Sequence, residues 1–161
     1  MNFKDLFKMQ AQLDSFIAKT QQIERDVFLE KGLALTIELA ELANETRCFK
    51  FWSTKGPSER EVILEEFVDS IHFLLSLGNE KGYLLHEWPK SEITEENLTT
   101  CFIRTQKSIL TFIESPSEDH YVAVWKEYGA IAYHLGFSLD DITGAYILKN
   151  EKNYERQRNG Y

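Results

Sequence analysis

The residues most suited to chemistry are four carboxylates arranged as two pairs. Glu38 and Glu41 form the first pair, and Glu66 and Asp69 form the second, each with i,i+3 spacing. Residues three apart face the same side of a helix, and the second pair lies on an apolar stripe that continues to Phe73. Unpaired ionised carboxylates are costly in such a position, so the four together require a positive partner.

A hard divalent cation with oxygen ligands is the natural partner, and Mg²⁺ is the first choice. Protein-bound Mg²⁺ usually combines one or two carboxylates with phosphate oxygens and water. Four carboxylates therefore suit two or more Mg²⁺ ions, which Mn²⁺ could replace, and a polyphosphate substrate that undergoes in-line displacement. We expect Glu38 or Glu41 to be the base that orients the attacking water, with Glu41 preferred.

Two other interpretations of the carboxylates stay open. A solvated acidic face is one, although the neighbours on the stripe are apolar. A di-iron site is the other, and it requires a Glu-x-x-His motif on each of two helices. Asp69-x-x-His72 is one imperfect half, and Asn44 stands where the other helix would need histidine. We expect His72 to support the site or to pack in the core.

Helical periodicity dominates the chain, and no alternating strand pattern occurs. The second expected helix is apolar nearly all round, which predicts a central position for it. A short connection to the third helix makes these two antiparallel neighbours, so the carboxylate pairs converge. The predicted class is all-α: a four-helix core carrying the metal site, with additional flanking helices, in one domain over residues 1–161. The first two expected helices cover about 3–20 and about 23 to the mid-forties. The third runs from a capping box at Ser58 and Glu61 to Gly82, and the fourth from a cap at Thr94 to Ile113. The fifth runs from a cap at Ser117 to Gly136, and the sixth from a cap at Ser138 toward the C-terminus.

Composition limits the function classes. The 161 residues are 43% hydrophobic and 27% charged, as in an ordinary globular protein. A formal net charge of -8 argues against a general nucleic-acid binder. No run is apolar enough for a signal peptide or a membrane span. Cys48 and Cys101 form no disulfide framework, so free thiols and a cytoplasmic location are expected.

The C-terminal segment carries a second pattern. Lys149, Asn153 and Arg156 are spaced i, i+4 and i+7, which places them on one face of a helix. Two cations with an amide between them would suit a row of phosphates. From composition alone, a frayed and charged tail is the alternative.

Taken together, the motifs resemble those of a known family. Glu-x-x-Glu, Glu-x-x-Asp-x-x-His-Phe and a terminal Lys-Asn-x-x-Asn-x-x-Arg-Gln-x-x-Gly-Tyr are similar to the dimeric all-α dUTP diphosphatases. These enzymes belong to the all-α NTP pyrophosphatase superfamily, which includes the MazG-type enzymes. The matching motifs run from near Gln10 to Tyr161. The resemblance implies a homodimer that hydrolyses dUTP, and dUDP, to dUMP with release of pyrophosphate or phosphate.

The resemblance also assigns roles to individual residues. It makes the four carboxylates Mg²⁺ ligands and gives nucleotide contacts to Gln10, Asp14, Lys50, Trp52, Lys149, Asn153 and Arg156, with Trp52 or Phe51 stacking on uracil. One departure concerns Asp14, where some members have an amide. A carboxylate only accepts hydrogen bonds, so Asp14 would also suit the amine of cytosine.

Two rival functions follow. The first is a related pyrophosphatase acting on dCTP or a non-standard nucleotide, which would differ only in the base pocket at Gln10, Asp14 and Trp52. The second is a non-catalytic helical interaction module. Such a module would not need all four carboxylates together with the Lys-Asn-Arg face.

Overall fold

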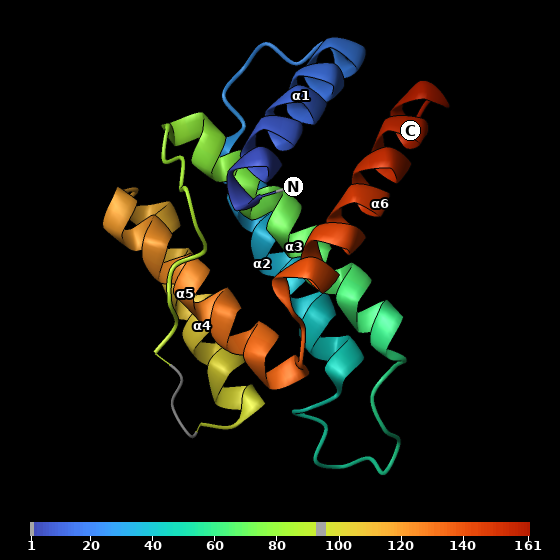
Figure 1. Cartoon of the computed structure of the whole chain (residues 1–161), viewed down its shortest axis with the longest axis vertical. Coiled ribbons are helices and arrows are strands. Elements are labelled where there is room, and N and C mark those ends of the chain that lie inside the picture. The colour runs from blue at the N-terminus through green and yellow to red at the C-terminus, as the bar shows by residue number, and fades with distance from the viewer. Residues whose placement is uncertain (1, 93–95) are drawn as a thin grey trace.

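The computed structural model describes residues 2–92 and 96–161, and its regular secondary structure in those ranges is helical throughout. The prediction of an all-α fold is therefore confirmed. The helices are α1 (Phe3–Gln21), α2 (Phe28–Thr46), α3 (Arg60–Lys81), α4 (Leu98–Glu114), α5 (Glu118–Leu135) and α6 (Leu139–Arg158). Figure 1 shows α1 and α6 on either side of α3, with the α4–α5 pair to one side.

Several helix starts follow from local capping. Ser117 accepts a hydrogen bond from the backbone N–H of His120 at the start of α5. Ser138 forms a capping box with Asp141 at the start of α6. Both caps were predicted, and each satisfies backbone donors that the first turn leaves free. The side chain of Asn97 caps α4, whereas the predicted cap Thr94 lies outside the described residues.

Two other helix starts were predicted wrongly. The second helix begins at Phe28, not Ile23, because Gln22 ends α1 in the left-handed region with φ 55°. The predicted capping box at Ser58 does not form, and α3 begins at Arg60 without a side-chain cap. The Ser58 hydroxyl donates to the Glu45 carboxylate on α2, so a contact between helices replaces the local one.

The central helix is α3, not α2 as predicted. α3 packs against α1, α2 and α6. The α4–α5 pair flanks this four-helix group, with α4 packed against α2 and side chains of α5 packed against α3. One apolar face of α2 points outward, with Leu29 66% exposed, Leu33 63% and Ile37 51%. Periodicity shows how apolar a helix is, but it does not say which neighbour covers each face.

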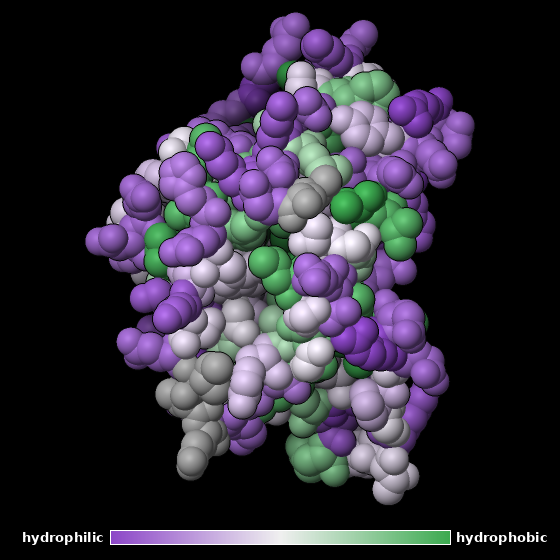
Figure 2. Space-filling model, in the orientation of Figure 1, coloured by the Kyte–Doolittle hydropathy of each residue, from purple (hydrophilic) through white to green (hydrophobic). Residues whose placement is uncertain are grey.

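The surface is consistent with the composition. Figure 2 shows a mostly hydrophilic face with small apolar patches. No helix in the described part of the chain is long and apolar enough to cross a membrane. Cys48 and Cys101 are free thiols, as predicted.

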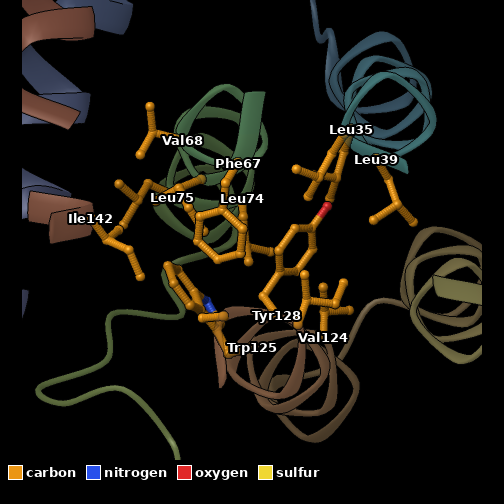
Figure 3. Packing of buried hydrophobic residues seen from close by; sticks show 14 of the residues in the cluster. Leu35, Leu39, Phe67, Val68, Leu74, Leu75, Val124, Trp125, Tyr128 and Ile142 are labelled. Carbon is orange, nitrogen blue, oxygen red and sulfur yellow. The ribbon is translucent and has the colours of Figure 1, made fainter. Parts of the chain in front are cut away.

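The core fixes α3 against α5. Figure 3 shows Phe67 and Leu74 of α3 facing Trp125 and Tyr128 of α5, and the rings of Phe67 and Tyr128 meet edge to face with centroids 5.8 Å apart. Such close packing leaves little freedom for α3 to shift. Since α3 carries Glu66 and Asp69, the core also fixes the backbone that holds these carboxylates.

Candidate metal and nucleotide site

The two carboxylate pairs converge where α2 and α3 pack together. Glu38 of α2 and Glu66 and Asp69 of α3 each offer one oxygen, and these atoms all lie within 4.8 Å of one another. Glu41 is outside this group, but it lines an adjoining shallow hollow together with Glu66 and Glu45. The structure therefore brings three of the four predicted ligands together and places the fourth beside them.

The electrostatics of this group are unfavourable without a cation. Burial raises the pKa of Glu38 to about 8, and the charges of Asp69 and Glu41 add to the effect. Burial likewise raises the pKa of Glu66 to about 7, again with contributions from Asp69 and Glu41. The Oε2 atoms of Glu38 and Glu66 are buried and have no hydrogen-bond partner among the described residues. Partly buried, mutually repelling carboxylates with unpartnered oxygens are a donor set that suits a hard divalent cation.

Lys149 provides the positive charge nearest to this group. Its ammonium lies 3.0 Å from Asp69 Oδ1 and 3.0 Å from Glu65 Oε1. Lys152 also contacts Glu65, at 3.0 Å. Burial raises the pKa of Asp69, and the hydrogen bond from Lys149 opposes that rise. Lys149, predicted to face phosphate, is paired with carboxylates in this structure.

A cavity of about 350 Å³ extends from the carboxylates between α1, α2, α3 and α6. Its wall is apolar around Leu13 and Ile17 of α1 and Phe73 of α3, and it has polar groups at both ends. It includes seven of the predicted site residues, namely Gln10, Asp14, Glu38, Asp69, Lys149, Asn153 and Arg156. An apolar wall with a few convergent polar groups is typical of a small-molecule pocket.

One end of the cavity contains a buried hydrogen-bond network. Gln10 Nε2 donates to Asp14 Oδ1 over 2.8 Å. Gln10 Oε1 accepts from the Tyr146 hydroxyl over 2.8 Å and lies 2.7 Å from His72 Nδ1. The His72 and Tyr146 rings are stacked, with centroids 4.2 Å apart. Tyr146 was not singled out from the sequence, because its only signal is its place four residues after Ile142 on the buried face of α6.

The position of His72 argues against a di-iron site. Its Nδ1 is engaged with Gln10, and neither ring nitrogen belongs to the group of ligand atoms that lie within 4.8 Å of one another. In the described part of the chain, the group able to hold a metal consists of carboxylates alone. His72 therefore supports the cavity rather than the cation site.

Contacts between α1 and the C-terminus lie beside the cavity, which Gln157 and Tyr161 help to line. Gln21 Nε2 donates to Gln157 Oε1 and to the backbone oxygen of Tyr161, each over 2.9 Å. The Arg156 guanidinium lies 5.3 Å from the centre of the Tyr161 ring. The C-terminal segment is thus an ordered helix in contact with α1, which disfavours a frayed tail.

Lys50 and Trp52 lie apart from this cavity. They belong to the connection between α2 and α3, where Trp52 is 65% exposed and touches Phe49 and Phe51 edge to face. Neither residue is among the described residues that line the cavity. Their contact with a nucleotide stays a prediction.

Clustered carboxylates beside a pocket with cationic side chains, on a helical fold, are features of the class of all-α nucleotide hydrolases. The sequence matches the family model described as dUTPase over residues 2–161. Because the match spans nearly the whole chain, the chain belongs to the dUTPase family, and it is a dUTP diphosphatase. No curated protein matched the sequence.

Proposed function

We propose that the chain is a Mg²⁺-dependent enzyme that hydrolyses both dUTP and dUDP to dUMP, with release of pyrophosphate or phosphate. The observation that carries this proposal is the group of three carboxylate oxygens within 4.8 Å of one another at the edge of a 350 Å³ cavity. Their repulsion needs a cation, and the cavity beside them has room for a nucleotide. The preference for Mg²⁺ rests on its affinity for carboxylate and phosphate oxygens.

Glu38, Glu66 and Asp69 would hold the cation, and Glu41 would be a further ligand of that cation or of a second one. When bound, Mg²⁺ would neutralise charge on the phosphate oxygens and make water more acidic. Glu41 is our choice for the base, because it borders the hollow without belonging to the tight group. It would orient the attacking water and accept its proton.

The cations of α6 would orient the phosphates. Arg156 and Asn153 line the cavity on one face of the helix. Lys149 would exchange Asp69 for a phosphate oxygen as the substrate enters, because it contacts Asp69 and also lines the cavity. Fixed donors around phosphate oxygens stabilise the charge that develops during in-line displacement.

A second candidate keeps the same reaction but changes the base. Asp14 lines the cavity beside Gln10 and, as a carboxylate, only accepts hydrogen bonds. That chemistry also suits the amine of cytosine, so dCTP is the competing substrate.

Release of phosphate and pyrophosphate from dUTP, dUDP, dCTP, dTTP and UTP tests both candidates. Each reaction is run with Mg²⁺, with Mn²⁺, and with a chelator. We expect fast Mg²⁺-dependent turnover of dUTP and dUDP, and slow turnover of dCTP and UTP. Preference for dCTP would favour the second candidate, and turnover that is unaffected by the chelator would contradict the role given to the carboxylates.

A homodimer is part of the proposal. The exposed face of α2 formed by Leu29, Leu33 and Ile37 adjoins α4, where Ile103 and Leu110 are also exposed. Two packed helices that both expose large apolar side chains are typical of a protein–protein interface. A second copy of the chain is the partner that we propose. Sedimentation should give a dimer for the wild type and a monomer for Leu33→Lys.

A further inference from the structure

The orientation of the Gln10 amide is determined by its neighbours. The Asp14 carboxylate accepts hydrogen bonds only, so Gln10 must turn its Nε2 toward it, and the two atoms lie 2.8 Å apart. The Oε1 of Gln10 then faces Tyr146 and His72, at 2.8 and 2.7 Å. The side chains of Gln10, His72 and Tyr146 are all buried. The amide is therefore held at both ends by protein groups.

The hydrogen bond with His72 fixes the tautomer of that ring. Burial, together with the charge of Lys149, lowers the pKa of His72 to about 3, so the imidazole is neutral. A neutral imidazole has a single N–H. Since Gln10 Oε1 can only accept, the proton must be on Nδ1. The ring also stacks on Tyr146 at an interplanar angle of 21°. The two side chains that donate to Gln10 therefore hold each other in position.

We propose that His72 and Tyr146 are positioning residues for base recognition, a role that rests on the dUTPase activity proposed above. Together they occupy the carbonyl oxygen of Gln10. One N–H of Nε2 is already donated to Asp14. The second N–H is the group that Gln10 has left for a ligand, and it lies beside the acceptor oxygens of Asp14.

A donor next to an acceptor complements the imide edge of uracil. Asp14 would accept the N3–H of the base, while Gln10 would donate to O4, the carbonyl oxygen that cytosine replaces by its amine. Cytosine in the same place would turn the lone pair of N3 toward Asp14 and its amine toward the N–H of Gln10. Both contacts would be inverted, and a pocket built for hydrogen bonds rejects such a ligand strongly. Cytosine could restore them only by sliding along its edge, which the phosphate contacts at the other end of the cavity oppose.

The first test compares Tyr146→Phe with wild type, and Tyr133→Phe serves as the matched control because Tyr133 is exposed on α5. Loss of one donor to Gln10 should raise KM for dUTP roughly five- to tenfold, the usual cost of one hydrogen bond. The preference for dUTP over dCTP, measured as the ratio of kcat/KM values, should fall by a similar factor. The kcat for dUTP should stay within about twofold, because the carboxylates are unchanged. An unaltered KM and an unaltered preference would overturn the inference.

A second test separates positioning from packing at His72. Asparagine can place an N–H near the position of Nδ1, whereas leucine fills similar space without a donor. His72→Asn should keep most of the preference for dUTP, and His72→Leu should lose it. Equal losses in the two variants would overturn the inference. Inactivity of the wild type toward dUTP would contradict the proposed function itself, whereas an active wild type with unaffected Tyr146→Phe and His72 variants would contradict only the positioning role.

Discussion

Two polar clusters lie beside α3, and they differ in how completely the protein satisfies them. In the carboxylate cluster, the Oε2 atoms of Glu38 and Glu66 are buried without a partner among the described residues. In the amide network, both the carbonyl and the amino group of Gln10 are hydrogen-bonded to protein side chains. The first cluster depends on something added from outside, and the second is already assembled.

This difference indicates separate roles and separate energetic consequences. A group of buried like charges lowers the stability of the empty protein, because desolvation and repulsion are not compensated. Such a cluster is retained for the ligand that it binds. A network whose central amide is paired at both ends stabilises the fold and holds its members in one arrangement, although His72 Nε2 has no partner among the described residues. The metal end of the cavity should therefore respond to cations and to pH, whereas the base end should respond little to cations, and its titrating group is Asp14, whose pKa is raised by burial.

The largest expected effect is the loss of activity in Glu66→Gln. Removal of a proposed Mg²⁺ ligand should lower kcat on the order of a thousandfold, because metal stabilisation of the transition state is worth several kcal/mol. The fold should persist, and Tm in the presence of a chelator should stay the same or rise, since one of the repelling charges is gone. Steady-state kinetics and thermal unfolding measure the two effects.

Glu65→Gln is the matched control for that variant. Glu65 is the preceding residue in the same helix, but its pKa is lowered by the hydrogen bonds from Lys149 and Lys152, whereas that of Glu66 is raised. We expect a small change in kcat and a stability loss below about 1 kcal/mol for this half-exposed group. Similar losses of activity in both variants would remove the distinction between a metal ligand and a surface ion pair.

An intermediate effect is expected for Lys149→Met. This change leaves Asp69 without its cation in a largely buried position, which should reduce the free energy of unfolding by roughly 3 kcal/mol in the presence of a chelator. Mg²⁺ should restore part of the loss by taking over the neutralisation. Lys152→Met is the control, since Lys152 is half exposed and pairs only with Glu65 among the described residues. Urea denaturation of both variants, with and without Mg²⁺, measures the two free energies of unfolding. Equal losses in Lys149→Met and Lys152→Met would contradict the role given to Lys149.

The smallest effect is the pH dependence of stability. Glu38 and Glu66 titrate near 8 and 7 in the folded protein, against an ordinary value of 4.5, so the folded state binds more protons than the unfolded state between those values. Both side chains are only partly buried, so solvent screening keeps the effect small. Stability without metal should therefore fall modestly as pH rises from about 5 to 8, with Tm decreasing on the order of 5 °C. Saturating Mg²⁺ should flatten this decline, because the ion replaces the protons. A Tm that rises with pH in the chelator would refute the assignment of raised pKa values.

The sequence predicted the parts of the site that depend on short-range geometry. The i,i+3 spacing of Glu38 with Glu41, and of Glu66 with Asp69, together with a short connection, was enough to expect two facing pairs. The caps at Ser117 and Ser138 are also local, and both formed as predicted.

Contacts between distant segments escaped prediction. Lys149 and Glu65 are 84 positions apart, and nothing in either neighbourhood signals their ion pair. Ser58 satisfies a capping pattern, yet the nearby carboxylate of Glu45 is its partner. The outward face of α2 escaped too, because an apolar side chain such as Leu33 has the same pattern whether α3 or another surface covers it.

The distribution of contacts along α6 divides this helix into two parts of unequal local stability. Its N-terminal part packs into the core through Ile142, Tyr146 and Asn150. Its last two turns are more exposed and depend on a few contacts with α1, such as the ring of Tyr154 against Phe16 and the bonds from Gln21. Amide hydrogen exchange should therefore quicken toward the C-terminal end. We therefore expect the segment that carries Arg156 to open for an entering triphosphate by partial, reversible unfolding, while the buried residues around Gln10 stay in place.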